Sequence, residues 1–209
     1  MNKELENILE KVGGLYNKYG IKSVTMDDVA RELGISKKTL YQFVENKNDL
    51  VSKVLDYLLH ERGCTLSEIA AKNQNAIEEL IETGVHIIKM FKEYNPSTEY
   101  DLKKYYPELF AKLNKVRTQR MYDAVLKNIV KGKKEGLYRL DMNDIIIAKI
   151  QTSRFMHLNI GDIFSPEELS NPQNVLELFI YHIRGIANEK GLKVLDEILK
   201  DIDINKYLQ

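Results

Sequence analysis

Two short segments with helical end signals follow each other along this chain with only three residues between them. Thr25 is suited to the N-cap of the first helix, with Asp28 three residues later, and Gly34 is placed to end that helix. Ser36 is suited to cap the next helix, so Gly34, Ile35 and Ser36 form the whole connection. Two capped helices joined by so short a turn predict a helix-turn-helix.

The second of these helices has one apolar side and one polar side. On a helix that starts at Lys37, the residues Leu40, Phe43 and Val44 share the buried face. The opposite side stacks a lysine over a tyrosine and a lysine over a glutamine at i, i+4 spacing. The outward residues are therefore Lys37, Lys38, Thr39, Tyr41 and Gln42.

The lysine pair stands where a cation is unfavourable. The amino end of a helix is the positive end of its dipole, and a cation there costs about 0.3–1 kcal/mol. Taken alone, Lys37 and Lys38 fit a solvated surface helix. Beside two capped helices and a three-residue turn they favour DNA, because free N–H groups and lysines at a helix start attract phosphate.

Composition identifies no partner, since Lys plus Arg and Asp plus Glu are 31 each in 209 residues. The single cysteine, Cys64, cannot form an intramolecular disulfide and favours a reducing compartment. The N-terminal segment has no apolar run typical of a signal peptide, and no segment is long and apolar enough to cross a bilayer. We expect a soluble, cytoplasmic protein without a membrane contact.

Helical periodicity continues through the rest of the chain, and no strand alternation is present. The fold class is therefore predicted to be all-α. The expected helices cover residues 4–19, 26–33, 37–44, 46–59, 66–94, 96–106, 109–131, 143–159, 173–189 and 191–204, with Gly132 and Gly136 marking the exit of the seventh. The apolar residues of 173–189 cover more than half of the helix circumference, which predicts a homodimer through the helices at about 143–159 and 173–189.

No sequence motif indicates an enzyme. The histidines His60, His86, His157 and His182 have no metal-ligand spacing, and neither a nucleophile motif nor a glycine-rich phosphate loop is present. We expect no metal, no cofactor and no catalytic activity. A helical enzyme with scattered catalytic residues and a helical protein-interaction adaptor stay open as alternatives.

Polar or soft side chains along apolar stripes of the C-terminal part are candidates for a small-molecule site, although each one also fits a core, interface or edge position. They are His86, Met90, Arg117, Met121, Arg154, Phe155 and His157.

The stretch TMDDVARELGISKKTLYQFVENKNDLVSKVL resembles the N-terminal DNA-binding segment of the TetR family of bacterial transcriptional regulators. The matching features are T-x-x-x-[VI]-A, L-G-[IV]-S, T-L-Y, the aromatic Phe43, and K-x-x-L at 47–50. Lys38, Gln42 and Val44 depart from common choices in the family, and the first two leave the operator sequence open.

The resemblance implies phosphate contacts at the caps Thr25 and Ser36 and at Lys47, with Lys37, Thr39 and Tyr41 facing the groove or its flanking backbone. Lys38 and Gln42 are assigned to DNA contact as well. It further implies a three-helix helix-turn-helix DNA-binding domain at 1–46 and a helical ligand-binding and dimerisation bundle at 47–209. The expected function is a homodimeric repressor that a small-molecule effector releases from a palindromic double-stranded DNA operator.

Overall fold

The computed structural model describes residues 3–72, 74–92, 95–157, 164–165, 167–168 and 171–201. These residues form helices and one isolated antiparallel bridge between Tyr138 and Ala187, so the prediction of an all-α fold is confirmed. Within the described ranges, no helix combines the length and the apolar character that crossing a bilayer requires.

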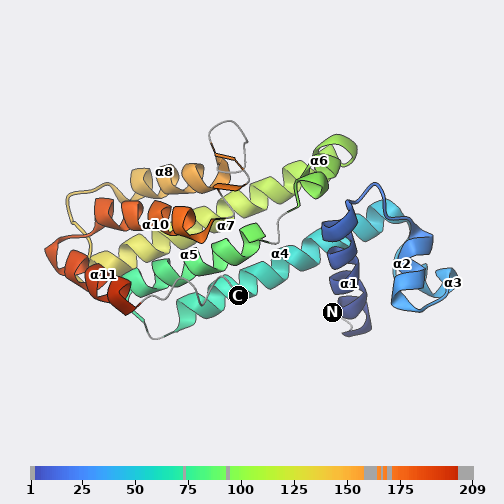
Figure 1. The fold of residues 1–209 in the computed structure, drawn as a ribbon, viewed down its shortest axis with the longest axis horizontal. Helices are drawn as coiled ribbons and strands as arrows, with labels where there is room; N and C mark the ends of the chain where they lie inside the picture. The colour runs from blue at the N-terminus through green and yellow to red at the C-terminus, as the bar shows by residue number, and fades with distance from the viewer. Residues whose placement is uncertain are drawn as a thin grey trace. The chain divides into compact units, whose positions relative to one another are not determined.

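The chain divides into two compact units, and α4 (Lys47–Ala71) and α7 (Pro107–Lys134) each have residues in both. Figure 1 labels these two helices. Unit 1 comprises Met1–Thr65 and Glu93–Arg117, and unit 2 comprises Leu66–Lys92 and Thr118–Gln209. The predicted division between a DNA-binding domain at 1–46 and a ligand-binding and dimerisation domain at 47–209 is a division by function, and it stays a prediction. The helices are α1 (Lys3–Tyr19), α2 (Met26–Leu33), α3 (Lys37–Leu40), α4 (Lys47–Ala71), α5 (Ala76–Lys92), α6 (Pro96–Tyr105), α7 (Pro107–Lys134), α8 (Asp144–His157), α10 (Pro172–Ile186) and α11 (Glu189–Asp201).

Unit 1 has one apolar core, to which the helix-turn-helix contributes its inward side chains. Val29 of α2, Leu40 of α3 and Val44 after it are buried in this core together with residues of α1, α4 and α6. The predicted inward face of the second helix is therefore correct at Leu40 and Val44, and Phe43 packs partly buried against the same core. Burial of these side chains fixes which side of α3 faces outward.

The predicted helix over residues 66–94 is wrong. α4 continues through residue 66 to Ala71, and α5 begins separately at Ala76. Asn75 starts α5, because its Oδ1 accepts the backbone N–H groups of Ile77 and Glu78, both at 3.0 Å, while its own N–H donates to Glu78 Oε2 at 2.8 Å. The pattern Asn75-x-x-Glu78 is a capping box. The apolar residues keep a helical period on both sides of it, so periodicity alone does not indicate that α4 and α5 are separate helices.

Gly132 does not mark the end of its helix, which is a second correction. α7 continues to Lys134, and Gly136 follows in a left-handed conformation with φ +69°. A Cβ atom on Gly132 would lie 2.1 Å from Cδ2 of Tyr138, so the glycine gives room to a fully buried ring. The Tyr138 hydroxyl donates to Asn128 Oδ1 at 2.9 Å.

The two helices predicted to form a dimer lie close to their expected bounds. α10 buries most of its apolar residues within its own chain and packs against α5. α8 instead leaves Ile146 and Ile150, one helical turn apart, 49% and 53% exposed. Apolar side chains this exposed on one helix face are typical of a surface that a partner covers.

Candidate nucleic-acid interface

The first helix of the helix-turn-helix begins with a complete capping box. The Thr25 hydroxyl accepts the Asp28 backbone N–H at 3.1 Å, and the Thr25 backbone N–H donates to Asp28 Oδ2 at 2.9 Å. Hydrogen bonds from the Thr25 hydroxyl and amide hold the pKa of Asp28 below its ordinary value. The predicted cap at Thr25 is confirmed.

The connection between α2 and α3 follows the sequence prediction. Gly34 ends α2 with φ +67°, and its N–H returns to the carbonyls of Ala30 and Arg31. Ser36 then caps α3 through a 3.0 Å hydrogen bond from Thr39 N to its hydroxyl oxygen. A residue other than glycine would be strained at position 34, since the left-handed region favours glycine.

The second helix is shorter than expected. α3 has a single turn, from Lys37 to Leu40, and residues 41–43 continue as turns in which Gln42 N donates to Thr39 O and Phe43 N to Leu40 O, both at 3.0 Å. These i, i+3 bonds preserve the sense of rotation, so the side chains still point as a helix would direct them. Lys37, Lys38, Tyr41 and Gln42 are exposed, Tyr41 by 44%, and Thr39 is half-buried.

An ion pair at Lys37 was missed by the sequence analysis. Lys37 Nζ lies 3.0 Å from the carboxylate of Asp27 in the first turn of α2. The hydrogen bond to Asp27 and its negative charge raise the pKa of Lys37. The unfavourable lysine at the start of α3 is therefore compensated within the protein itself, by an acid that stabilises the start of α2.

Lys47, at the start of α4, is half-buried. Its Nζ donates to the backbone carbonyl of Lys22 at 3.3 Å. Burial, and then the charge of Lys22, lower the pKa of Lys47. This contact holds the lysine against the turn that leads into the Thr25 cap.

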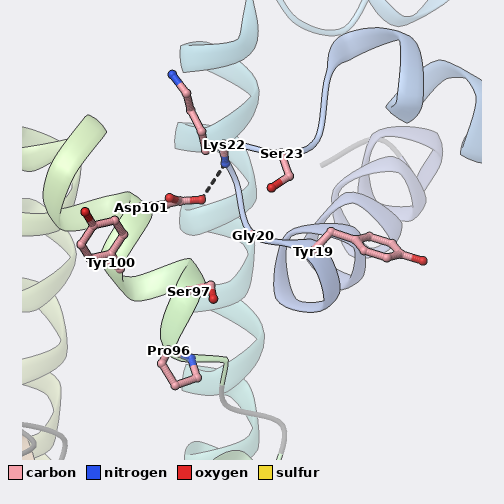
Figure 2. A pocket seen from close by; sticks show the side chains of 8 residues that line it. All are labelled: Tyr19, Gly20, Lys22, Ser23, Pro96, Ser97, Tyr100 and Asp101. Carbon is pink, nitrogen blue, oxygen red and sulfur yellow. Dashed lines mark hydrogen bonds between the residues drawn. The ribbon is translucent and has the colours of Figure 1, made fainter.

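The same turn is fixed from the other side by α6. Figure 2 shows the Asp101 carboxylate directed at the backbone of Lys22, whose N–H donates to Asp101 Oδ2 at 2.7 Å. Thr98 Oγ1 donates to Tyr16 O at 2.7 Å, and Asn95 Nδ2 donates to the carbonyl of Asn17. An open pocket of about 500 Å³ lies at this junction. α6 thereby positions the residues that precede the cap.

The candidate ligand residues lie on three helices, α5, α7 and α8. His86 and Met90 are on α5, and all described side chains of the set are partly buried. Arg117 belongs to unit 1 and Met121 to unit 2, although both are on α7. Arg154 and Phe155 of α8 contact α10, and the His157 side chain lies outside the described residues. Within the described ranges, no three His, Cys, Asp or Glu residues form a group that could hold a metal ion.

Comparison with known proteins agrees with this geometry. Residues 9–54 match the model of the bacterial regulatory proteins of the tetR family. Over 150 residues the chain is 26% identical to an uncharacterized HTH-type transcriptional regulator of Bacillus subtilis, YvaF, covering 69% of this chain and 73% of that protein. It is also 25% identical over 152 residues to the isocitrate dehydrogenase [NADP] of Rickettsia felis; that match covers 72% of this chain but only 30% of the dehydrogenase.

The fold is similar to that of a TetR transcription regulator from Haloarcula marismortui. The two structures superpose with a TM-score of 0.69 at 17% identity, covering 90% of this chain and all of the other. At this identity the likeness shows the fold alone. It extends beyond residues 9–54 to most of the helical C-terminal part.

Proposed function

We propose that this chain, which belongs to the TetR family through its N-terminal domain, is a homodimeric repressor. In this proposal it binds a palindromic DNA operator in the cytoplasm and leaves the operator when a small-molecule effector binds. The observation that supports this most directly is the outward surface of α3. Lysines, hydroxyls, a phenol and an amide are gathered there, beside two capped helix starts, on the domain that matches the family.

In this proposal the helix starts hold the duplex backbone. The first N–H groups of a helix have no partner within the helix, so those that follow the Thr25 and Ser36 caps would donate to phosphate oxygens. Lys47 would contribute a further phosphate contact at the start of α4. Such contacts fix the register of the protein on the duplex without reading its sequence.

Sequence would be read from the single turn of α3 and the two residues that follow it. Lys37, Thr39 and Tyr41 would face the major groove or its edge, with Lys38 and Gln42 next to them. A glutamine can form a bidentate pair with adenine, and a lysine can donate to the acceptors of guanine. Because α3 is so short, few base pairs per half-site would be contacted directly.

A homodimer would supply the second half-site. The exposed face of α8 around Ile146 and Ile150 is available for a second copy. Two DNA-binding domains related by a two-fold axis would engage successive major grooves about 34–36 Å apart. An effector bound in the C-terminal part would favour a different spacing and so shift the population away from DNA.

The test is a binding titration against duplex DNA containing the promoter region next to the gene. We expect affinity to fall steeply as salt rises, with a slope of about −0.9 per phosphate contact in a log–log plot. Lys37→Ala should weaken binding and reduce the steepness of that slope by about 1. Tyr41→Ala should weaken binding to the operator about tenfold while non-specific DNA is affected less.

Lys193→Ala is the matched control, since Lys193 is an exposed lysine on α11 in unit 2. It should leave operator affinity unchanged. If Lys37→Ala and Tyr41→Ala behave like this control, the α3 surface does not read DNA. Absence of any salt-dependent duplex binding would favour the protein-interaction adaptor.

A further inference from the structure

Two buried polar side chains interrupt the apolar contact between α8 and α10. Gln151 of α8 is 1% exposed and His182 of α10 is 7% exposed. In each, one nitrogen, Nε2, is fully buried and has no hydrogen-bond partner among the residues that the structure describes. Buried polar atoms of native proteins are nearly always paired, so these two indicate that a binding partner completes the site.

Arg154 connects Gln151, on its own helix, with the backbone of α10. Its Nη1 donates to Gln151 Oε1 at 3.2 Å, and its Nη2 donates to the backbone carbonyl of Leu178 at 3.3 Å. Because the amide oxygen of Gln151 faces the guanidinium, the unpaired atom is the amide nitrogen, which is a donor. Across the described ranges, no carboxylate lies within ion-pair distance of Arg154, in contrast to Arg184 on the exposed side of α10, which pairs with Asp196.

His182 is uncharged next to this cation. Burial, and then the charge of Arg154, lower the pKa of His182 to about 4. The cluster therefore presents one fixed positive charge, an amide donor and a neutral imidazole. A single water could pair one of the buried atoms, but it would not neutralise the guanidinium.

Apolar side chains adjoin this polar cluster. The rings of Phe155, next to Arg154, and Phe179, three residues before His182, have centroids 4.8 Å apart. Together with Ile88 and Val175 they form a small cluster distinct from the main core of unit 2. A guanidinium next to these buried and partly buried aromatic and aliphatic side chains matches an amphipathic molecule with one anionic end.

We propose that Arg154, Gln151 and His182 bind the carboxylate of an amphipathic small molecule whose apolar part lies along Phe155 and Phe179. A carboxylate carries one negative charge, which matches one guanidinium, and its two oxygens accept enough hydrogen bonds to pair the Gln151 amide and an Nε2–H of His182. A phosphate monoester would bring a second charge for which the cluster has no cation. This proposal names the effector class of the proposed function, but binding itself does not depend on DNA.

The test uses the full-length protein without DNA and decanoate as the probe, kept below its micelle concentration. Calorimetric titration should show decanoate binding about tenfold or more tightly than decanol or decylamine, because only the carboxylate pairs with the guanidinium. Arg154→Met keeps the length of the side chain and should remove this preference. Gln151→Glu should weaken decanoate binding to a similar degree, since it places a carboxylate beside the ligand.

Arg184→Met is the matched control, since it removes an exposed arginine from α10 and should leave decanoate binding unchanged. Arg154→Lys retains the charge and should give an intermediate affinity, which covers the case in which Arg154→Met does not fold. Equal affinities for decanoate and decanol, or unchanged decanoate binding in Arg154→Met, would overturn the assignment. If decanoate binds as expected but leaves duplex affinity unchanged, the site stands and the proposed release from the operator fails.

Discussion

The ion pair between Lys37 and Asp27 connects the two halves of the helix-turn-helix at the level of single side chains. Both side chains are largely solvent-exposed, so the pair contributes little to folding. The ion pair would instead affect the affinity for DNA. A phosphate that approached Lys37 would compete with the Asp27 carboxylate, and that carboxylate would repel the duplex.

We therefore predict that Asp27→Asn strengthens operator binding. The change keeps a polar side chain in the first turn of α2, frees Lys37 and removes one negative charge near the phosphates, which should raise affinity about twofold to fivefold at low salt. A fluorescence anisotropy titration at two salt concentrations measures the effect. The double variant Asp27→Asn with Lys37→Ala should lose the gain, and weaker binding by Asp27→Asn alone would contradict the role given to the pair.

Gly132 gives a second prediction from a single position. Gly132→Ala would place a methyl group against the ring of fully buried Tyr138, and the resulting overpacking should reduce the free energy of unfolding by about 3 kcal/mol. Gly14→Ala is the matched control, because Gly14 is helical and exposed with no atom within 4 Å of an added Cβ. That variant should be more stable by about 1 kcal/mol.

Urea denaturation followed by circular dichroism measures both changes. If the two glycine variants shift the midpoint in the same direction, packing against Tyr138 is not what requires the glycine at 132.

Among the helices, α6 has a role that could not be predicted from its sequence. Its N-cap Asn95 and its residues Thr98 and Asp101 form hydrogen bonds to the end of α1 and to the turn that precedes α2. Asp101 is buried, and Gly20, in a left-handed conformation with φ +80°, approaches its carboxylate. The position of the Thr25 cap is thus set by a helix about seventy residues further along the chain.

We predict that Asp101→Ala weakens operator binding about tenfold although Asp101 does not face the α3 surface. The unpaired Lys22 N–H and the loosened turn should shift the Thr25 cap away from its phosphate, since removing one partner of a buried hydrogen bond costs about 1–3 kcal/mol. Anisotropy titration well below the melting temperature measures the loss. Asp101→Asn retains an acceptor oxygen and should recover most of the affinity; unchanged binding in Asp101→Ala would refute this positioning role.

For the molecule as a whole, the exposed face of α8 is the surface on which the proposed dimer depends. Ile146 and Ile150 are half exposed and share one side of the helix, and exposed Tyr181 of α10 belongs to the same pair of helices. In a two-fold interface the same surface of both copies meets. Glutamates placed on this face would therefore be buried in the interface, close to the like charges of the second copy.

The double variant Ile146→Glu, Ile150→Glu should be monomeric in sedimentation velocity at concentrations at which the unmodified protein is a dimer. It should lose most operator affinity, because a monomer contacts only one half-site. Leu140→Glu is the control, since Leu140 is more exposed but lies in the loop before α8. A dimer that survives the double change would show that α8 is not the interface.

The local features of the helix-turn-helix follow from the sequence alone. The caps at Thr25 and Ser36, the left-handed Gly34 and the inward face through Leu40 and Val44 are set by neighbouring residues, because capping bonds and helical periodicity act over three or four positions. The same short range explains the family resemblance, which lies in one continuous segment, and the all-α fold class.

Contacts between distant segments were decided only by the tertiary structure. The sequence spacing does not indicate the pairing of Lys37 with Asp27, the hydrogen bond of Asp101 to Lys22, or the proximity of His182 to Arg154. Apolar residues keep their period across the helix break before Asn75, so periodicity does not indicate that break. Burial and hydrogen bonding between elements depend on how those elements pack, and for that reason the proposed carboxylate site could be inferred only from the structure.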